Sequence, residues 1–418
     1  MLTPLRIVTL LAVALFGAPA TAAIVELQGP AIAGLAGRHP AEVDLAVYQD
    51  GDFVSLTHQW LPWSQGRAPW FEEDGDAERS QPADRIAAED HLLVDLPDTA
   101  RAAPAPLPEE VLGVLTVGTG EDARSLYALA RRPPERPAPE RLQRDPLALR
   151  TPAFQLAFED DNLFRWGDFF YAGRTGADGQ PLNLLDSLKL RLSAGVFSAG
   201  ARLTLTNENL DPEIRQLEDG PLATRAYVTT RVRVAGLPVL KLHNYFLIRD
   251  RAVAVHSRFT LPGFAAAVLR EPGARVTVDG NNLSGARLRT SWTGEREARV
   301  DGHLDDSERA MVDTPVPTDN WLWFGTGDGF DLLARLYFAD GFDTGARFIY
   351  QDDPDLDDEP ERFPGQRPNV GFALDRIPFG QSFYFVAELY FSDGQGEDDP
   401  AAYAARRLAS PASHWQPR

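Results

Sequence analysis

The chain has 418 residues, no cysteine and a formal net charge of -20, because 61 acidic residues outnumber 41 basic ones. The lack of cysteine excludes a disulfide framework, a lipidated N-terminal cysteine, a thiol nucleophile and a cysteine-ligated metal centre. The negative charge argues against nucleic acid and anionic lipid as partners.

The N-terminus predicts a secretory signal peptide over residues 1–22. Arg6 precedes the apolar run 7–17, which is shorter than the ~20 residues that a membrane-spanning helix needs. Ala20-Thr21-Ala22 then matches the small-x-small pattern that precedes a cleavage site. We therefore expect a periplasmic or secreted protein of the bacterial cell envelope that begins near Ala23. An uncleaved membrane anchor is the alternative, and no later segment resembles a membrane span.

Residues 23–101 predict a small N-terminal β module, and residues 102–150 predict a proline-rich connector. In the module, short apolar runs alternate with turn residues such as Asp50-Gly51-Asp52. In the connector, closely spaced prolines fix φ and remove amide donors, so a central strand or a long helix is excluded there. The apolar runs 111–117 and 125–130 can form one hairpin within the connector.

Residues 151–418 predict a large antiparallel β-sandwich domain. Residues 188–192 and 201–206 place an apolar residue at every second position, which is typical of strands with one buried face. The runs 225–234, 238–248 and 251–261 predict a three-stranded meander. Further strands are expected at 275–278, 287–292, 331–338, 347–350, 371–374 and 382–391. Helical periodicity occurs only at 305–312 and 400–408. The predicted fold class is therefore mainly β, an antiparallel β-sandwich or supersandwich with a smaller N-terminal β module.

Two histidines on neighbouring predicted strands are candidates for proton transfer. His243 is flanked by Lys241 and Tyr245 at the two-residue spacing that shares a sheet face, and His256 lies on the next strand. If that face lines a cleft, it supplies a general acid or base. The alternative is that these are partly buried sheet residues with satisfied hydrogen bonds. The sequence has no HExxH motif, G-x-S-x-G elbow, P-loop or dinucleotide fingerprint.

The acidic stretch 352–359 is a candidate metal site through Asp352, Asp353, Asp355 and Asp357. Closely spaced carboxylates repel one another, and calcium relieves this repulsion with roughly six to eight oxygen ligands. The stretch lacks the central glycine of an EF-hand loop. Calcium is the one cofactor that the sequence suggests, and a solvated acidic loop is the alternative.

Two aromatic clusters are candidates for ligand binding. Trp166 and Tyr171 belong to the first cluster, and Trp321 and Trp323 belong to the second. Aromatic rings can stack on the apolar faces of sugars, so these residues suggest a glycan site. The alternative is core packing. Trp321 and Trp323 share one strand face, and Leu322 and Phe324 share the other, so at least one of the two faces is expected to be buried.

The stretch from about Phe170 to Phe391 resembles the β-supersandwich domains of galactose mutarotase-like proteins and of some exported polysaccharide lyases. The resemblance rests on the strand opening 220–225 and on the meander that contains residues 245–253. It implies a sheet-lined cleft that uses histidine, tyrosine, arginine or acidic residues, and the residues that the resemblance suggests are His243, Tyr245 and Arg231. The chain also resembles exported proteins of proteobacteria.

We expect an exported β-sandwich protein that binds a ligand, a glycan or an envelope protein without catalysis, because no catalytic motif is present. The alternative is a carbohydrate-active enzyme, either a polysaccharide lyase or a sugar epimerase, that abstracts a proton in a sheet-lined cleft.

Overall fold

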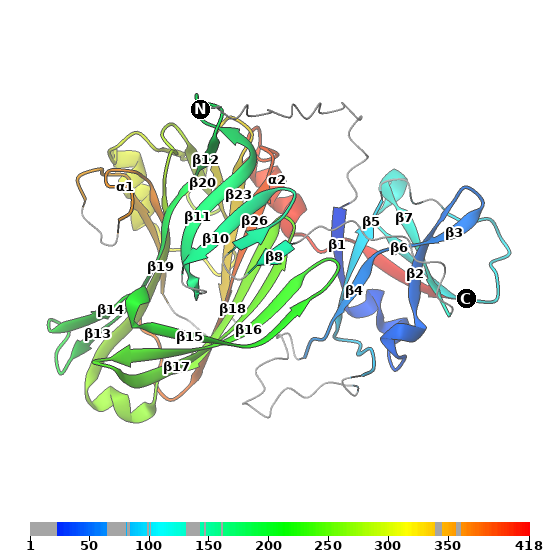
Figure 1. Ribbon diagram of the computed structural model, residues 1–418, viewed down its shortest axis with the longest axis horizontal. Helices are drawn as coiled ribbons and strands as arrows, with labels where there is room; N and C mark the ends of the chain where they lie inside the picture. The colour runs from blue at the N-terminus through cyan, green and yellow to red at the C-terminus, as the bar shows by residue number, and fades with distance from the viewer. Residues whose placement is uncertain are drawn as a thin grey trace, which may run out of the picture.

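The computed structural model of the protein describes residues 23–64, 81, 84–97, 100, 102–130, 143–145, 148–159, 162–338, 345–356 and 361–418. The predicted signal peptide, residues 1–22, lies outside these ranges. The fold is mainly β and is built from antiparallel sheets, which confirms the predicted fold class. Figure 1 shows a small module that contains the N-terminal strands beside a larger sandwich.

Two sheets form the N-terminal module, and their facing sides share one apolar core. The small sheet has the strand order β1 (Ala23–Gln28), β5 (His91–Leu96), β4 (His58–Leu61). The terminal sheet has the order β27 (Ser413–Pro417), β6 (Val111–Val117), β7 (Arg124–Leu129), β2 (Asp44–Gln49), β3 (Asp52–Ser55). The hairpin expected in the connector is β6 and β7, so it shares a sheet with strands of the N-terminal module. Short 3-10 turns complete the module at η1 (Gly29–Ala31), η2 (Ala33–Leu35), η3 (Pro40–Glu42) and η5 (Gly120–Asp122).

The terminal sheet is completed by residues from the far end of the chain. Strand β27 pairs with β6, and the indole of Trp415 packs on Gly34 and Gly113. A Cβ at Gly34 would lie 2.0 Å from the indole, and a Cβ at Gly113 would lie 2.3 Å from it. Only glycine therefore permits this contact, which holds β27 against the module.

Two five-stranded sheets lie side by side and form one layer of the sandwich. The capping sheet has the order β12 (Pro181–Asn183), β11 (Asn162–Thr175), β10 (Phe154–Glu159), β9 (Ala148–Arg150), β8 (Gln143–Asp145). The facing sheet has the order β14 (Arg202–Leu205), β13 (Leu185–Val196), β19 (Leu269–Gly280), β25 (Asn369–Leu374), β24 (Ala346–Gln351).

The other layer is a nine-stranded sheet, called here the large sheet. Its order is β15 (Leu210–Asp219), β16 (Thr224–Val234), β17 (Leu237–Arg249), β18 (Ala252–Thr260), β26 (Ser382–Ser392), β23 (Asp331–Phe338), β22 (Leu322–Gly325), β20 (Arg287–Thr290), β21 (Ala298–Arg299). Strands β16, β17 and β18 are the predicted meander. The inner face of the large sheet packs on the capping and facing sheets, and part of its outer face packs on the small sheet of the N-terminal module.

Helices are short in the described part of the chain. The α-helices are α1 (Asp306–Asp313) and α2 (Pro400–Leu408), and the remaining 3-10 turns are η6 (Asn207–Asn209) and η7 (Gly263–Ala267). Helix α1 begins with a capping box in which Asp305 and Glu308 exchange hydrogen bonds with backbone amides. No helix among the described residues combines the length and the apolar character that crossing a membrane requires.

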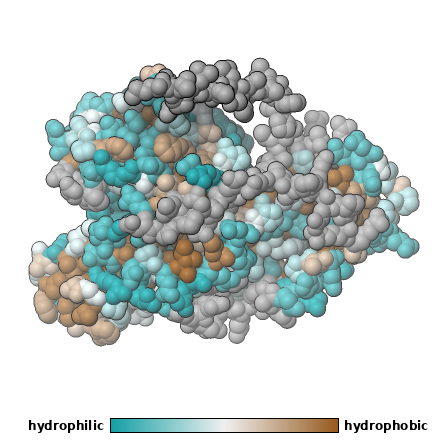
Figure 2. Space-filling model, in the orientation of Figure 1, coloured by the Kyte–Doolittle hydropathy of each residue, from teal (hydrophilic) through white to brown (hydrophobic). Residues whose placement is uncertain are grey.

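The surface of the sandwich is apolar at one end. Figure 2 shows hydrophobic residues gathered at the lower left, where Figure 1 places η7 and the turn between β13 and β14. Hydrophilic residues are abundant elsewhere on the coloured surface of this view, with smaller hydrophobic areas among them, as expected for a chain of net charge -20.

Candidate functional site

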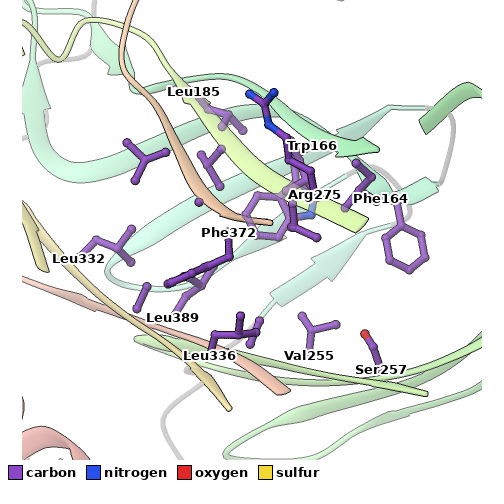
Figure 3. Close-up of a pocket in the computed structure, with 18 of the residues that line it drawn as sticks. Phe164, Trp166, Leu185, Val255, Ser257, Arg275, Leu332, Leu336, Phe372 and Leu389 are labelled. Carbon is purple, nitrogen blue, oxygen red and sulfur yellow. The ribbon is translucent and has the colours of Figure 1, made fainter. Parts of the chain in front are cut away.

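A cavity of about 270 Å³ lies inside the sandwich, between the inner face of the large sheet and the two sheets opposite it. Figure 3 shows Trp166 and Phe164 on one side of this cavity and Leu336 and Val255 on the other, with Phe372 between them. The side chains come from the capping, facing and large sheets, and most of them are aliphatic or aromatic. The cavity is therefore an apolar compartment in the middle of the fold.

Period-two alternation places these side chains on one face of the large sheet. Leu242 and Phe246 on β17 line the cavity, as do Val255 and Phe259 on β18. The centre of this wall is small, because Ala387 on β26 lies directly opposite Val255 on one neighbouring strand. On its other side Ala387 lies opposite Leu336 of β23. A short side chain at this central position leaves room between the layers.

Three polar side chains form a ladder across adjacent strands in the same wall. Thr230 of β16 donates to Asn244 Oδ1 of β17 over 3.4 Å, and Asn244 Nδ2 donates to Ser257 Oγ of β18 over 2.8 Å. All three side chains are buried and line the cavity. Buried polar groups are costly unless they are hydrogen-bonded, so the ladder satisfies its own members. It gives one region of an apolar wall hydrogen-bonding capacity, and Figure 3 shows Ser257 at the edge of the cavity.

The predicted catalytic residues lie on the opposite, outer face of the large sheet. His243 Nδ1 is 2.7 Å from the hydroxyl of Tyr227, and the two rings stack with an interplanar angle of 10°. Tyr245 is 1% exposed and packs in the core cluster between the large sheet and the N-terminal module. Arg231 is at the same face but is partly exposed, with Nη2 3.1 Å from Glu213 Oε2. His243 and Tyr245 share a face, as their spacing predicted, and Arg231 of the neighbouring strand lies on the same face, which is turned away from the cavity.

His256 is the most strongly perturbed histidine on that outer face. It is 3% exposed, its Nδ1 lies 2.6 Å from the hydroxyl of Tyr384, and the edges of Trp63 and Tyr245 approach it. Burial away from water lowers the pKa of His256 to about 3, although the negative charge of Glu26 opposes the change. The imidazole is therefore neutral around neutral pH.

An ion network beside His256 joins the N-terminal module to the large sheet. Glu26 Oε1 is 2.7 Å from His91 Nδ1, and Arg249 Nη1 donates to Glu26 Oε2 over 2.7 Å. Burial raises the pKa of the Glu26 carboxyl, but Arg249 and His91 outweigh burial and lower the pKa to about 2. This network contributes to the docking of β1 and β5 on β17.

The structure separates the acidic residues that were proposed to bind calcium. Asp352 is buried, and its Oδ2 accepts from the backbone amides of Asp301 and Gly302 over 2.7 Å and 2.9 Å. Asp353 and Asp355 are exposed, and Asp353 Oδ1 accepts from the amide of Asp355. Asp357 lies outside the described residues. Among the residues described, no group of three or more His, Asp or Glu side chains is arranged to hold a metal ion, and calcium stays a prediction.

The predicted ligand-binding aromatic residues occupy different surroundings. Trp166 lines the cavity, and its Nε1 donates to the carbonyl of Leu163. Tyr171 is buried, and its hydroxyl donates to Asp393 over 3.0 Å. Trp323 is fully buried, and Trp321 is partly buried against the same core cluster. Of these residues, Trp166 is the one that reaches the cavity.

Sequence reasoning did not find the polar ladder. The signal that could have revealed it is a polar residue within an apolar alternation, as in Leu242-x-Asn244-x-Phe246 and Val255-x-Ser257-x-Phe259. The histidines at the neighbouring positions, His243 and His256, belong to the other face of the same strands.

Comparisons with known proteins find no matching family model, and no curated protein sequence matches the chain. Among solved structures, heparinase III matches 60% of the chain with 8% identity and a TM-score of 0.30. The heparan sulfate lyase HepC from Pedobacter heparinus matches 71% with 13% identity and a TM-score of 0.30. The α-N-acetylgalactosaminidase NagBb from Bifidobacterium bifidum matches 62% with 12% identity and a TM-score of 0.34. The chain spans less than half the length of each of those proteins, because the matches cover 35%, 38% and 39% of them.

Proposed function

We propose that the protein binds an amphipathic ligand in the cavity of the sandwich, outside the cytoplasm and without chemical turnover. The observation that supports this proposal is the apolar cavity of about 270 Å³ between the large sheet and the sheets opposite it. The ligand class is an apolar chain or ring system that carries one hydrogen-bonding group. The signal-like sequence of residues 1–22 supports a role in the periplasm or in the external medium.

The size of the cavity supports occupation by a ligand. Protein interiors are close-packed, and unfilled space costs about 24 cal/mol per Å³ in unfolding free energy. A volume of about 270 Å³ then corresponds to about 6.5 kcal/mol, which is comparable with the total stability of about 5 to 15 kcal/mol of a typical protein. A bound apolar molecule restores these contacts and gains roughly 0.8 kcal/mol for each buried methylene group.

The polar ladder supports a ligand with a polar end. Ser257 Oγ accepts from Asn244 and keeps its own hydroxyl hydrogen for another acceptor, such as a carbonyl or carboxylate oxygen. Binding sites for small molecules are mostly apolar and use a few placed polar groups to fix orientation. Thr230, Asn244 and Ser257 meet this description, and the lining also includes the side chains of Arg191, Arg275 and Arg335.

The lining supports binding in preference to catalysis. The described residues around the cavity include no Asp, Glu, His, Lys or Tyr side chain, which are the groups that usually transfer protons. The candidates for proton transfer, His243 and Tyr245, occupy the outer face of the large sheet. A carbohydrate-active enzyme would need acid and base groups beside its substrate.

The test is a titration with N-phenyl-1-naphthylamine, whose fluorescence rises in apolar surroundings. We expect saturable binding at one site, and an Ala387→Phe variant should lose affinity at least about tenfold because the ring fills the centre of the cavity. The matched control is Ala405→Phe, which makes the same substitution on the exposed face of α2 and should bind as the wild type does. Circular dichroism establishes that both variants are folded. Unchanged affinity in a folded Ala387→Phe protein would refute the proposal.

A further inference from the structure

Three segments at one end of the sandwich expose large apolar side chains and are named here the apolar tips. They are the β13–β14 turn within residues 192–201, the β16–β17 turn within residues 234–240, and the η7 region within residues 259–269. None of the three ranges contains a charged residue. Phe197 is 73% exposed, Leu237 is 69% exposed and Phe264 is 83% exposed. Such a group of exposed apolar side chains marks an interaction site.

The apolar tips form one surface although they are distant in sequence. The amide of Phe197 donates to the carbonyl of Val268 over 2.7 Å, which joins the first tip to the third. Leu192, Leu240 and Leu261, one from each of the three ranges, pack against the same core cluster. Figures 1 and 2 place the resulting patch at the lower left end of the sandwich.

Charged side chains of both signs border the apolar tips. Arg202 follows the first tip and lies 3.9 Å from Glu271, Arg233 precedes the second tip and pairs with Asp211 over 2.6 Å, and Arg270 follows the third tip. Arg270 is exposed, and its Nη1 donates to the carbonyl of Ala266 over 2.6 Å. Apolar side chains bordered by basic side chains are typical of surfaces that enter the interface of a lipid bilayer, where a guanidinium group such as that of Arg270 reaches the phosphates.

We propose that the apolar tips insert into the surface of a zwitterionic phospholipid bilayer. Separate protruding turns suit a fluid phase that adapts to their shape, whereas a protein partner must present a matching surface. The net charge of -20 repels anionic lipid, so a neutral bilayer is the surface that the charge permits. This inference stands on the exposed tips and does not depend on the cavity.

The experiment uses the natural lack of cysteine to place one fluorescent reporter. Ser198→Cys, in the first tip, is labelled with an environment-sensitive nitrobenzoxadiazole dye and mixed with phosphatidylcholine vesicles. We expect a blue shift and an intensity gain on mixing. The same dye at Ala405→Cys on α2 should show neither change, because that site lies away from the tips.

Vesicle co-sedimentation measures the strength of binding. Replacing Phe197 and Phe264 with serine should lower the partition coefficient by at least about tenfold, because each phenylalanine loses its transfer into the bilayer. The control is Leu356→Ser, which removes an exposed apolar side chain outside the tips and should leave the coefficient unchanged. The double variant should still bind N-phenyl-1-naphthylamine in the cavity, which separates this proposal from the proposed function.

Three results would overturn the proposal. One is a double variant that sediments with vesicles as strongly as the wild type does. Another is stronger binding to phosphatidylglycerol than to phosphatidylcholine vesicles, since that contradicts the charge argument. The last is a blue shift that grows with protein concentration in the absence of vesicles and accompanies a dimer in sedimentation velocity, because the tips would then contact a second copy of the chain.

Discussion

Lowering the pH should destabilise the protein through His256, and the magnitude follows from its burial. The pKa of this imidazole is lowered from 6.5 to about 3 in the folded state, because the ring is removed from water beneath the N-terminal module. Between these two values the unfolded chain binds a proton that the folded chain does not. The free energy of unfolding therefore falls as the pH falls through this window.

The expected loss can be worked out for about pH 5. That pH lies 1.5 units below the unfolded pKa of 6.5, and each unit is worth about 1.4 kcal/mol, so His256 removes about 2 kcal/mol of stability relative to neutral pH. Glu26 acts in a lower window, because its folded pKa of about 2 and its unfolded value of 4.5 place its contribution below about pH 4.5. The two effects can thus be separated.

The assay is urea unfolding followed by tryptophan fluorescence at about pH 7 and about pH 5. The ring centroids of Trp63 and His256 are 5.4 Å apart, so the fluorescence of Trp63 is sensitive to this region. A His256→Gln variant keeps hydrogen-bonding capacity towards Tyr384 and cannot titrate. The wild type should lose about 2 kcal/mol more than the variant between the two pH values. Equal losses in the two proteins would show that His256 is not a buried neutral group and would refute the reasoning.

Two further predictions concern a contact that holds β27 in the terminal sheet and an ion pair between the neighbouring strands β13 and β19 of the facing sheet. Trp415→Ala should lower the unfolding free energy by about 3 to 5 kcal/mol, as removal of a packed tryptophan does. Limited proteolysis of this variant should then release the residues after 412. Proteolysis at the wild-type rate would contradict the packing of Trp415 on Gly113. Lys189→Met should cost about 3 to 5 kcal/mol, because it leaves Asp279 as an unpaired buried carboxylate after loss of the 2.6 Å ion pair. The double variant with Asp279→Leu should recover most of that loss in urea unfolding, and no recovery would show that the pair is not the cause.

Local patterning predicted the elements well where each strand has one buried face. The meander β16, β17 and β18 was expected within a few residues, because apolar residues recur at every second position. The helices α1 and α2 were expected from their helical periodicity. Alternation also correctly predicted that His243 and Tyr245 share a face.

The surroundings of those faces could not be predicted from the sequence. Alternation does not show which side of a sheet another module covers, and packing of Leu61 and Trp63 against the outer face is what buries Tyr245 and lowers the pKa of His256. The cavity depends on which strands become neighbours, such as Ala387 beside Val255. These pairings join residues more than a hundred positions apart and leave no local signal.

The return of residues 413–417 to the terminal sheet has a consequence for biosynthesis. A ribosome makes the N-terminal module first, but one edge of β6 remains unpaired until about three hundred further residues have been synthesised. An open edge is a template for pairing with other chains, so a nascent or prematurely terminated polypeptide carries an aggregation hazard that the finished molecule has closed. Any fusion partner attached after Arg418 would emerge beside the first module that was translated, not at a remote end of the protein.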